Sequence, residues 1–95
     1  MKITQTQNGS KLITKFNALG DSTRFRLFKR LLKDDGICVS ELASEVHISN
    51  AGVSQQLKIM EQAGIITRQR EGQKICYRID QSDPENKKLL EMLGQ

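Results

Sequence analysis

Residues 40–66 constrain the fold of this chain more than any other segment. They read as two short helices joined by a tight turn, with a strand directly after the second helix. In the second helix Val53, Leu57 and Met60 recur at i, i+4 and i+7 and form one apolar stripe. The other face carries small, amide-bearing or cationic side chains that suit base edges and phosphates: Asn50, Ser54, Gln55, Gln56 and Lys58. The pattern is typical of a helix-turn-helix and indicates DNA binding.

The segments before this motif predict two further helices and a short strand. We expect helices at residues 10–19 and 22–34, a strand near 37–39 and the first motif helix at 41–46. The expected N-caps are Ser10, then Asp21 or Ser22, then Ser40. In the first helix the apolar residues fall at i, i+4 and i+7 and should face inward: Leu12, Phe16 and Leu19.

The segments after the turn between the two motif helices predict a recognition helix and a hairpin. Ser49 is the expected N-cap of the recognition helix at residues 50–63. Strands are expected at residues 65–70 and 74–79, because Gly72 lies in the short polar segment between them and gives a hairpin signal.

A last helix is expected at residues 84–93, where Asp83 and Pro84 give a cap followed by proline at the first helical position. Its apolar cluster is large for so short a helix, which indicates that it docks on another surface: Leu89, Leu90, Met92 and Leu93. The predicted fold is mostly α (α+β), a winged helix-turn-helix with a two- or three-stranded β wing and a C-terminal helix. We expect one domain at residues 10–95 after a flexible N-terminus at 1–9.

Four segments, in order, resemble those of ArsR/SmtB-type repressors over about residues 16–80. ALGDSTR at 18–24 resembles the family's ALGDPTR, and ICVSEL at 37–42 resembles its LCVCEL. Residues 48–58 resemble its recognition helix LSQSTVSHHLK, and residues 70–79 resemble its wing REGRWVYYRL. The resemblance implies a repressor that is a homodimer through its first and last helices, with the C-terminal helix as a dimerisation helix. It also implies an operator of double-stranded DNA with imperfect two-fold symmetry, and repression relieved by an effector.

The N-terminal half of the recognition helix should lie closest to the base edges of the major groove. The residues expected there are Ser49, Asn50, Ala51, Gly52, Ser54, Gln55 and Gln56. A glutamine can pair with adenine through two hydrogen bonds, whereas Ala51 and Gly52 let the backbone approach closely. Gly52 costs the helix roughly 1 kcal/mol relative to alanine, which such an approach would explain. Ordinary exposed helix surface is the alternative for Gln55 and Gln56.

Contacts to phosphate are expected from Lys58, which lies about one turn after Ser54, and from the hairpin. The hairpin offers Arg68, Arg70, Gln73 and Lys74. Such side chains can enter the minor groove or hold the DNA backbone; a hairpin edge that only promotes solubility is the alternative. Arg24, near the start of the second helix, is either structural or phosphate-facing.

The net charge of +4 is unevenly placed along the chain. Residues 1–36 hold eight Lys/Arg against three Asp, which gives +5, and residues 64–79 hold four Lys/Arg against one Glu, which gives +3. These basic segments flank a recognition helix that is nearly neutral. The arrangement suits phosphate clamps on both sides of a groove, and a solvated surface is the alternative.

The metal sites of the resembled family are incomplete in this chain. One site type uses two cysteines before the recognition helix; Cys38 matches the first, but Ser40 holds the second position. One thiolate does not make a soft-metal site. The other site type places Asp and His ligands on the last helix, which here has no histidine. The one histidine, His47, falls at the turn between the motif helices and should be a helix-end residue. We therefore expect no metal and no cofactor.

The two cysteines, Cys38 and Cys76, lead to a redox hypothesis. In a winged helix the short strand near Cys38 can pair with the second wing strand, which contains Cys76. Each cysteine alternates with inward-facing apolar residues, so both thiols can project from the same face as neighbours. Oxidation would tie the wing to the helix before the recognition helix, provided that the Cα atoms lie within about 7 Å. Two half-buried thiols without a role are the alternative.

Other classes of protein lack support in the sequence. No apolar run approaches a membrane span and the N-terminus has no signal-peptide pattern, so we expect a cytoplasmic protein with no membrane partner and reduced thiols. There is no Ser/His/Asp set and no glycine loop for phosphate, so we expect no enzyme. The sequence predicts a sequence-specific, dimeric transcriptional repressor. The alternative is a winged-helix module for protein–protein contacts, without specific DNA binding.

Overall fold

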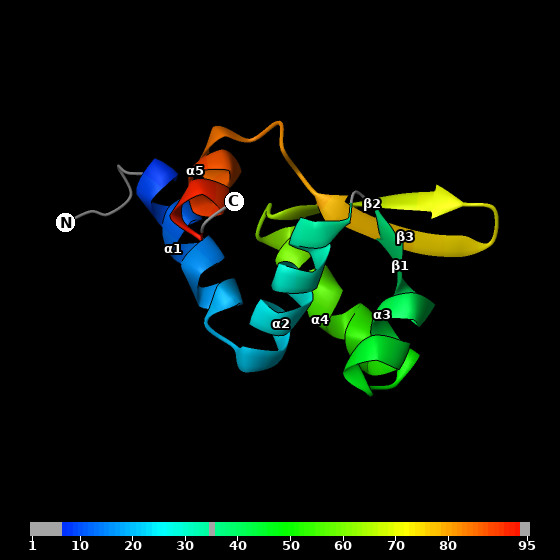
Figure 1. Ribbon diagram of the computed structural model, residues 1–95. Coiled ribbons are helices and arrows are strands. Elements are labelled where there is room, and N and C mark those ends of the chain that lie inside the picture. The colour runs from blue at the N-terminus through cyan, green and yellow to red at the C-terminus, as the bar shows by residue number, and fades with distance from the viewer. Residues whose placement is uncertain (1–6, 35, 94–95) are drawn as a thin grey trace.

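The computed structural model describes residues 7–34 and 36–93, with side chains from residue 11 onward. The helices are α1 (Gln7–Leu19), α2 (Ser22–Lys33), α3 (Val39–Val46), α4 (Asn50–Gln62) and α5 (Pro84–Met92). The strands are β1 (Ile37–Cys38), β2 (Ile66–Glu71) and β3 (Lys74–Ile79). In Figure 1, α1 and α5 lie side by side at one end of the molecule and the β2–β3 hairpin extends from the other. The predicted winged helix-turn-helix is confirmed.

The three strands form one antiparallel sheet in the order β1-β3-β2. The sequence allowed a wing of two or three strands, and the structure has three. Gly72 lies in the two-residue hairpin turn between β2 and β3 and has a φ of 65°, a left-handed conformation that glycine adopts without strain.

The core lies between α2, α4 and the sheet. Val53, Leu57 and Met60 are each 0% exposed, so the apolar stripe predicted for the recognition helix is the buried one. It packs in one cluster with residues of the other elements: Leu27, Phe28 and Leu31 of α2, Leu42 of α3, and Tyr77 and Ile79 of β3. Each such side chain contributes about 1.5–3 kcal/mol by leaving water, and together they fix which face of α4 points outward.

Several helix starts follow the predicted caps. The Asp21, Ser49 and Asp83 side chains accept hydrogen bonds from the backbone N–H groups two or three residues later, at 2.9–3.1 Å. Two predicted starts are wrong. Helix α1 begins at Gln7, so Ser10 lies inside it, and residues 1–6 of the segment expected to be flexible lie outside the described residues.

The start of α3 is the second boundary that differs from the prediction. The helix begins at Val39 with Cys38 as its N-cap, rather than after Ser40. The physical reason is Glu41, which lies three residues after Cys38 and whose Oε1 accepts a hydrogen bond from the Cys38 N–H at 3.1 Å. This bond fixes Cys38 as the N-cap, so the helix begins before Ser40. The strand β1 therefore runs into α3 without a loop.

The face of α1 is also different from the prediction. Phe16 was expected to point inward but is 46% exposed, whereas Lys15 is 1% exposed. The Lys15 ammonium lies 2.7 Å from Asp83 and 2.9 Å from Glu85, at the start of α5. Burial lowers the pKa of Lys15, but hydrogen bonds to Asp83 and Glu85 outweigh it and leave the pKa raised. The ion pairs hold α1 against α5.

Asn86 connects α5 to the end of the recognition helix. The residue is 1% exposed, and its side-chain amide donates to the backbone oxygens of Gly64 and Asp80, both at 2.8 Å.

Among the described helices, none is both long and apolar enough to span a membrane.

Candidate nucleic-acid interface

The two motif helices meet at a tight turn after α3. His47 ends α3 in the left-handed conformation, with φ at 59°, and is the one non-glycine residue of the described part with positive φ. The Ile48 N–H then bonds to the Ala43 oxygen at 3.2 Å. His47 is thus a helix-end residue, as predicted, and the turn directs the chain into Ser49 and α4.

The outer face of α4 is open to solvent. Asn50, Ala51, Gln55 and Lys58 are exposed, and Ser54 is partly exposed. These side chains are therefore not used for packing within the protein. They are available to a partner, and they belong to the polar face that the sequence singled out; Gln56 of that face makes an internal contact instead.

Gly52 has an internal role that the sequence did not reveal. A Cβ atom at this position would lie 2.9 Å from the Ile48 side chain and 3.1 Å from the Ser49 hydroxyl. The Gly52 N–H is also the donor to that hydroxyl, at 3.0 Å. Close packing of the first turn against Ile48 therefore explains the glycine without any contribution from DNA.

Gln56 and Arg24 interact with each other. The Arg24 guanidinium donates to Gln56 Oε1 at 2.8 Å and to the Ala18 backbone oxygen at 2.6 Å. Of the two roles left open for Arg24, the structural one is realised, because this side chain joins the end of α1 to the recognition helix. The oxygen of Gln56 is occupied by that contact, whereas Gln55, its neighbour in sequence, is exposed.

Helix α3 is held in place by a second arginine. Arg30 of α2 forms a two-pronged ion pair with Glu45 of α3 and also contacts Asp34. The hydrogen bonds from Arg30 lower the pKa of Glu45. These contacts hold the first motif helix, α3, against α2.

The wing presents cations next to α4. Arg68 and Arg70 of β2 lie opposite Tyr77 and Ile75 of β3, so they belong to the sheet face that packs toward the core and α4. Both arginines are exposed, as are Gln73 and Lys74 at the hairpin tip. A hollow of about 310 Å³ lies between helix and wing and is lined by both: Cys38, Ser40, Asn50, Ser54, Gln73 and Lys74 among others. The hollow thus joins Asn50 and Ser54 of α4 to Gln73 and Lys74 of the wing, whereas Arg68 and Arg70 lie on the other face of the hairpin from Lys74.

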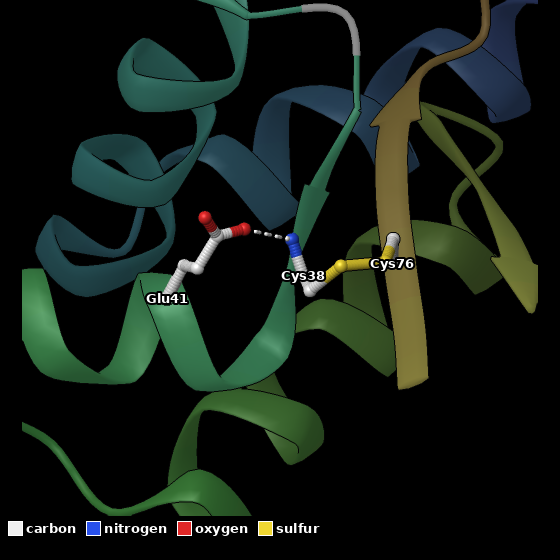
Figure 2. Close-up of a disulfide and its surroundings, with 3 residues drawn as sticks. All are labelled: Cys38, Glu41 and Cys76. Atoms are coloured by element: carbon white, nitrogen blue, oxygen red, sulfur yellow. Dashed lines mark hydrogen bonds between the residues drawn. A yellow bond between two sulfur atoms is a disulfide. The ribbon is translucent and has the colours of Figure 1, made fainter. Parts of the chain in front are cut away.

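The two cysteines are joined. Cys38 and Cys76 face each other across β1 and β3, their Cα atoms are 3.7 Å apart, and their sulfurs form a disulfide (Figure 2). The proximity that the redox hypothesis required is confirmed, and the expectation of two free thiols is not met. Cys76 is only 2% exposed, whereas Cys38 is half-buried.

Glu71 is a neighbour of this pair that the sequence analysis missed. Its carboxylate and the two sulfurs lie within 4.8 Å of one another. The strand register is the signal that would have found it, because Cys76 lies opposite Gln69 and Glu71 follows on the same side of β2. With the sulfurs bonded to each other, this group offers no pair of thiolates to a metal ion.

A second surface is apolar and lies away from the wing. The large apolar side chains that remain exposed in the described part are Ile13 (62%) and Phe16 (46%) of α1, Ile59 (38%), and Met92 (67%) and Leu93 (38%) at the end of α5. Four of the five belong to α1 and the end of α5, which lie next to each other (Figure 1). Clustered exposed apolar residues are typical of an interface.

Comparisons with known proteins agree with this geometry. A helix-turn-helix domain family matches residues 19–69. A candidate arsenical resistance operon repressor, ArsR2, from Halobacterium salinarum is 42% identical over 57 residues, which cover 59% of this chain and 48% of the relative. The cadmium resistance transcriptional regulatory protein CadC homolog of Staphylococcus aureus is 31% identical over 85 residues, which cover 90% of this chain and 69% of the relative.

The chain spans only part of these relatives, since matches cover 48%, 55% and 36% of the first three. Among solved structures, a homodimeric winged helix-turn-helix DNA-binding domain from Mycobacterium bovis superposes with a TM-score of 0.82. It is 17% identical, and the match covers 98% of this chain and 83% of that chain. That likeness establishes the shared fold.

Proposed function

Because the chain belongs to the ArsR/SmtB family of winged helix-turn-helix transcriptional regulators, we propose that it is a dimeric repressor that binds operator DNA. Members of this family regulate transcription and are not enzymes. The observation that supports DNA as the partner is the solvent-exposed polar flank of α4, which shares one hollow with Gln73 and Lys74 at the tip of the wing. We also propose that the protein acts in the cytoplasm.

Sequence reading is assigned to the first two turns of α4. The N-terminal half of such a helix lies nearest the base edges of the major groove. Gln55 is exposed and its amide is free of the contact that holds Gln56, so it is the proposed reader of adenine. Asn50, Ala51 and Ser54 complete the base-facing surface, whereas Ser49, Gly52 and Gln56 mainly shape and orient it.

Phosphate contacts are assigned to Lys58 and to the wing. Arg68 and Arg70 lie on the wing face turned toward α4, and Gln73 and Lys74 lie at the tip. Cations so placed can meet the sugar–phosphate backbone on the flank of the groove that α4 enters, or reach into the neighbouring minor groove.

The dimer is assigned to α1 and α5. Their exposed apolar side chains, led by Met92 and Ile13, would leave water in a two-fold interface. The domain from Mycobacterium bovis with the same fold is described as homodimeric. A two-fold dimer presents two copies of α4 to half-sites that lie about one helical turn apart.

The test compares two glutamines of one helix. An operator is first selected from a random-sequence DNA pool with the wild-type protein, and binding is then measured by fluorescence anisotropy for Gln55→Ala and for Gln62→Ala. Gln62 is exposed two turns further along α4, away from the proposed base contacts, and serves as the matched control.

Gln55→Ala should weaken operator binding by about tenfold or more, because a bidentate pair contributes about 1–3 kcal/mol of discrimination. Its binding to unrelated DNA should stay near wild type, and Gln62→Ala should change neither. Equal losses on both DNAs would argue against base reading by Gln55. A protein that selects no sequence and shows little salt dependence would instead be the protein-interaction module.

A further inference from the structure

We propose that Cys38 and Cys76 form a reversible redox pair, which hydrogen peroxide closes and a dithiol reopens, and whose closure tightens DNA binding. The chemical part stands on the geometry of the two sulfurs. The regulatory part rests on the proposed function.

The disulfide encloses the part of the chain that is proposed to contact DNA, here called the reading unit (residues 38–76). Closing the bond makes a covalent ring of residues 38–76, since the two cysteines are 38 positions apart. The ring contains α3, the turn, α4, β2 and the first half of β3, and with them every residue assigned to DNA contact. Helices α1, α2 and α5 lie outside it. The bond therefore acts on the reading unit and leaves the proposed dimer surface untouched.

The bond also joins two elements that otherwise share few hydrogen bonds. Strand β1 has two residues, and its pairing with β3 comprises Ile37 with Tyr77 and Cys38 with Cys76. Cys38 is at the same time the N-cap of α3. A covalent link at this residue therefore fixes the start of the motif helices directly to the central strand of the wing (Figure 2).

The surroundings suit thiol chemistry. Cys38 is half-buried and lines the hollow between α4 and the wing, so a small oxidant can reach it. Lys74 and Arg78 lie two residues on either side of Cys76 in β3, on the same face of the strand. Their positive charges favour the thiolate of Cys76, which is the reactive form of the thiol. The nearby Glu71 carboxylate has the opposite effect, because its charge is negative.

The reaction balances with peroxide as the only co-reactant. The Cys38 thiolate attacks one oxygen of hydrogen peroxide, forms a sulfenic acid and releases hydroxide, which a proton converts to water. The Cys76 thiolate then attacks the Cys38 sulfur, forms the S–S bond and releases a second hydroxide, which becomes water. Two thiols and one peroxide thus give one disulfide and two waters. A dithiol returns two electrons and two protons by exchange.

Closure should help DNA binding through pre-organisation. With the bond open, two backbone pairings and side-chain packing alone hold β1 against β3, and no covalent link fixes the start of α3 to the wing. A binder that is already fixed in its bound arrangement loses less freedom on association. We expect the oxidised protein to bind its operator about fivefold more tightly than the reduced protein.

The experiment uses the full chain in both redox states. Protein reduced with dithiothreitol and freed of reductant is titrated with hydrogen peroxide, and the bridge is read by intact mass, by loss of alkylation and by peptide mapping. Operator and unrelated DNA are then titrated with each state of the same preparation. Cys38→Ser and Cys76→Ala are carried as controls, with circular dichroism to verify that they fold.

The expected result is a Cys38–Cys76 bridge after mild oxidation, reversal by dithiol, and tighter operator binding only when the bridge is present. Both variants should bind alike with and without peroxide. Failure of the bridge to form would overturn the proposal, and so would a bridge that leaves affinity unchanged or lowers it. Absence of operator binding in either state would count against the proposed function, whereas the mass and alkylation results would still report on the thiol pair.

Discussion

Opening the Cys38–Cys76 bond should lower the thermal stability of the domain by an amount set by the size of the ring. The bond joins residues 38 positions apart. In the chain-entropy treatment, a ring of that size stabilises the fold by about 4 kcal/mol at 25 °C, because the closed unfolded chain has fewer conformations. This is the upper value, since the unfolded chain retains some structure that the bond does not restrict further.

The corresponding change in melting temperature is large. For a domain of this size, 1 kcal/mol moves the midpoint by about 4–8 °C, so complete reduction should lower it by roughly 15–30 °C. The assay is circular dichroism during heating, with and without dithiothreitol. Both samples need the same protein concentration, because a dimer melts at a temperature that depends on it.

A double variant provides the control. Cys38→Ser combined with Cys76→Ala should melt near the reduced wild type and should not respond to dithiothreitol. If oxidised and reduced wild type melted within about 2 °C of each other, less than 1 kcal/mol would separate them. The ring would then not restrict the unfolded chain to the extent that its size predicts.

The wing, the apolar face of α1 and the α1–α5 ion pairs each give one further outcome. Arg70→Ala should weaken binding to all DNA and lower the slope of log affinity against log salt by about one; an unchanged slope would remove Arg70 from the interface. Phe16→Glu should shift the protein toward monomer in analytical ultracentrifugation with its helix content retained, and a persistent dimer would speak against α1 as an interface. The hydrogen bond from Lys15, more than that from the backbone, lowers the pKa of Asp83. The stability from Asp83 is therefore present above the ordinary Asp pKa of about 3.9 and is lost as pH falls through the lowered value. The melting temperature of the Lys15→Met variant should therefore fall less steeply with decreasing pH than that of wild type. Equal slopes of melting temperature against pH would contradict this.

The parts of the fold that the sequence predicted are those with local signals. The stripe of α4, its Ser49 cap and the Asp83–Pro84 start of α5 each depend on residues within a few positions of one another. The nearness of the two cysteines was also predicted, because strand alternation and the pairing of the strand near Cys38 with the second wing strand allow both thiols to project from one face. The register that places Cys38 directly opposite Cys76 comes from the structure.

The parts that the sequence missed depend on contacts between distant elements. An apolar spacing placed Phe16 inward, but its helix turns a lysine inward instead, because the acidic start of α5 offers Lys15 two partners. No pattern within α1 contains that information. The cap at Cys38 was missed for a smaller reason: the Glu41 side chain accepts from the Cys38 N–H and so starts the helix before Ser40.

The recognition helix shows how internal contacts divide labour between neighbouring residues. On its inner side, α4 is held by its apolar stripe, by the close packing of Gly52 on Ile48 and by the bond from Arg24 to Gln56. These contacts fix the rotation of the helix about its own axis. Because a base-reading side chain must reach its partner within hydrogen-bond distance, such fixation matters as much as the exposed residues themselves. Gln55 and Gln56 look equivalent in the sequence, yet Gln55 is exposed, whereas Gln56 accepts a hydrogen bond from Arg24 and helps to hold the helix in place.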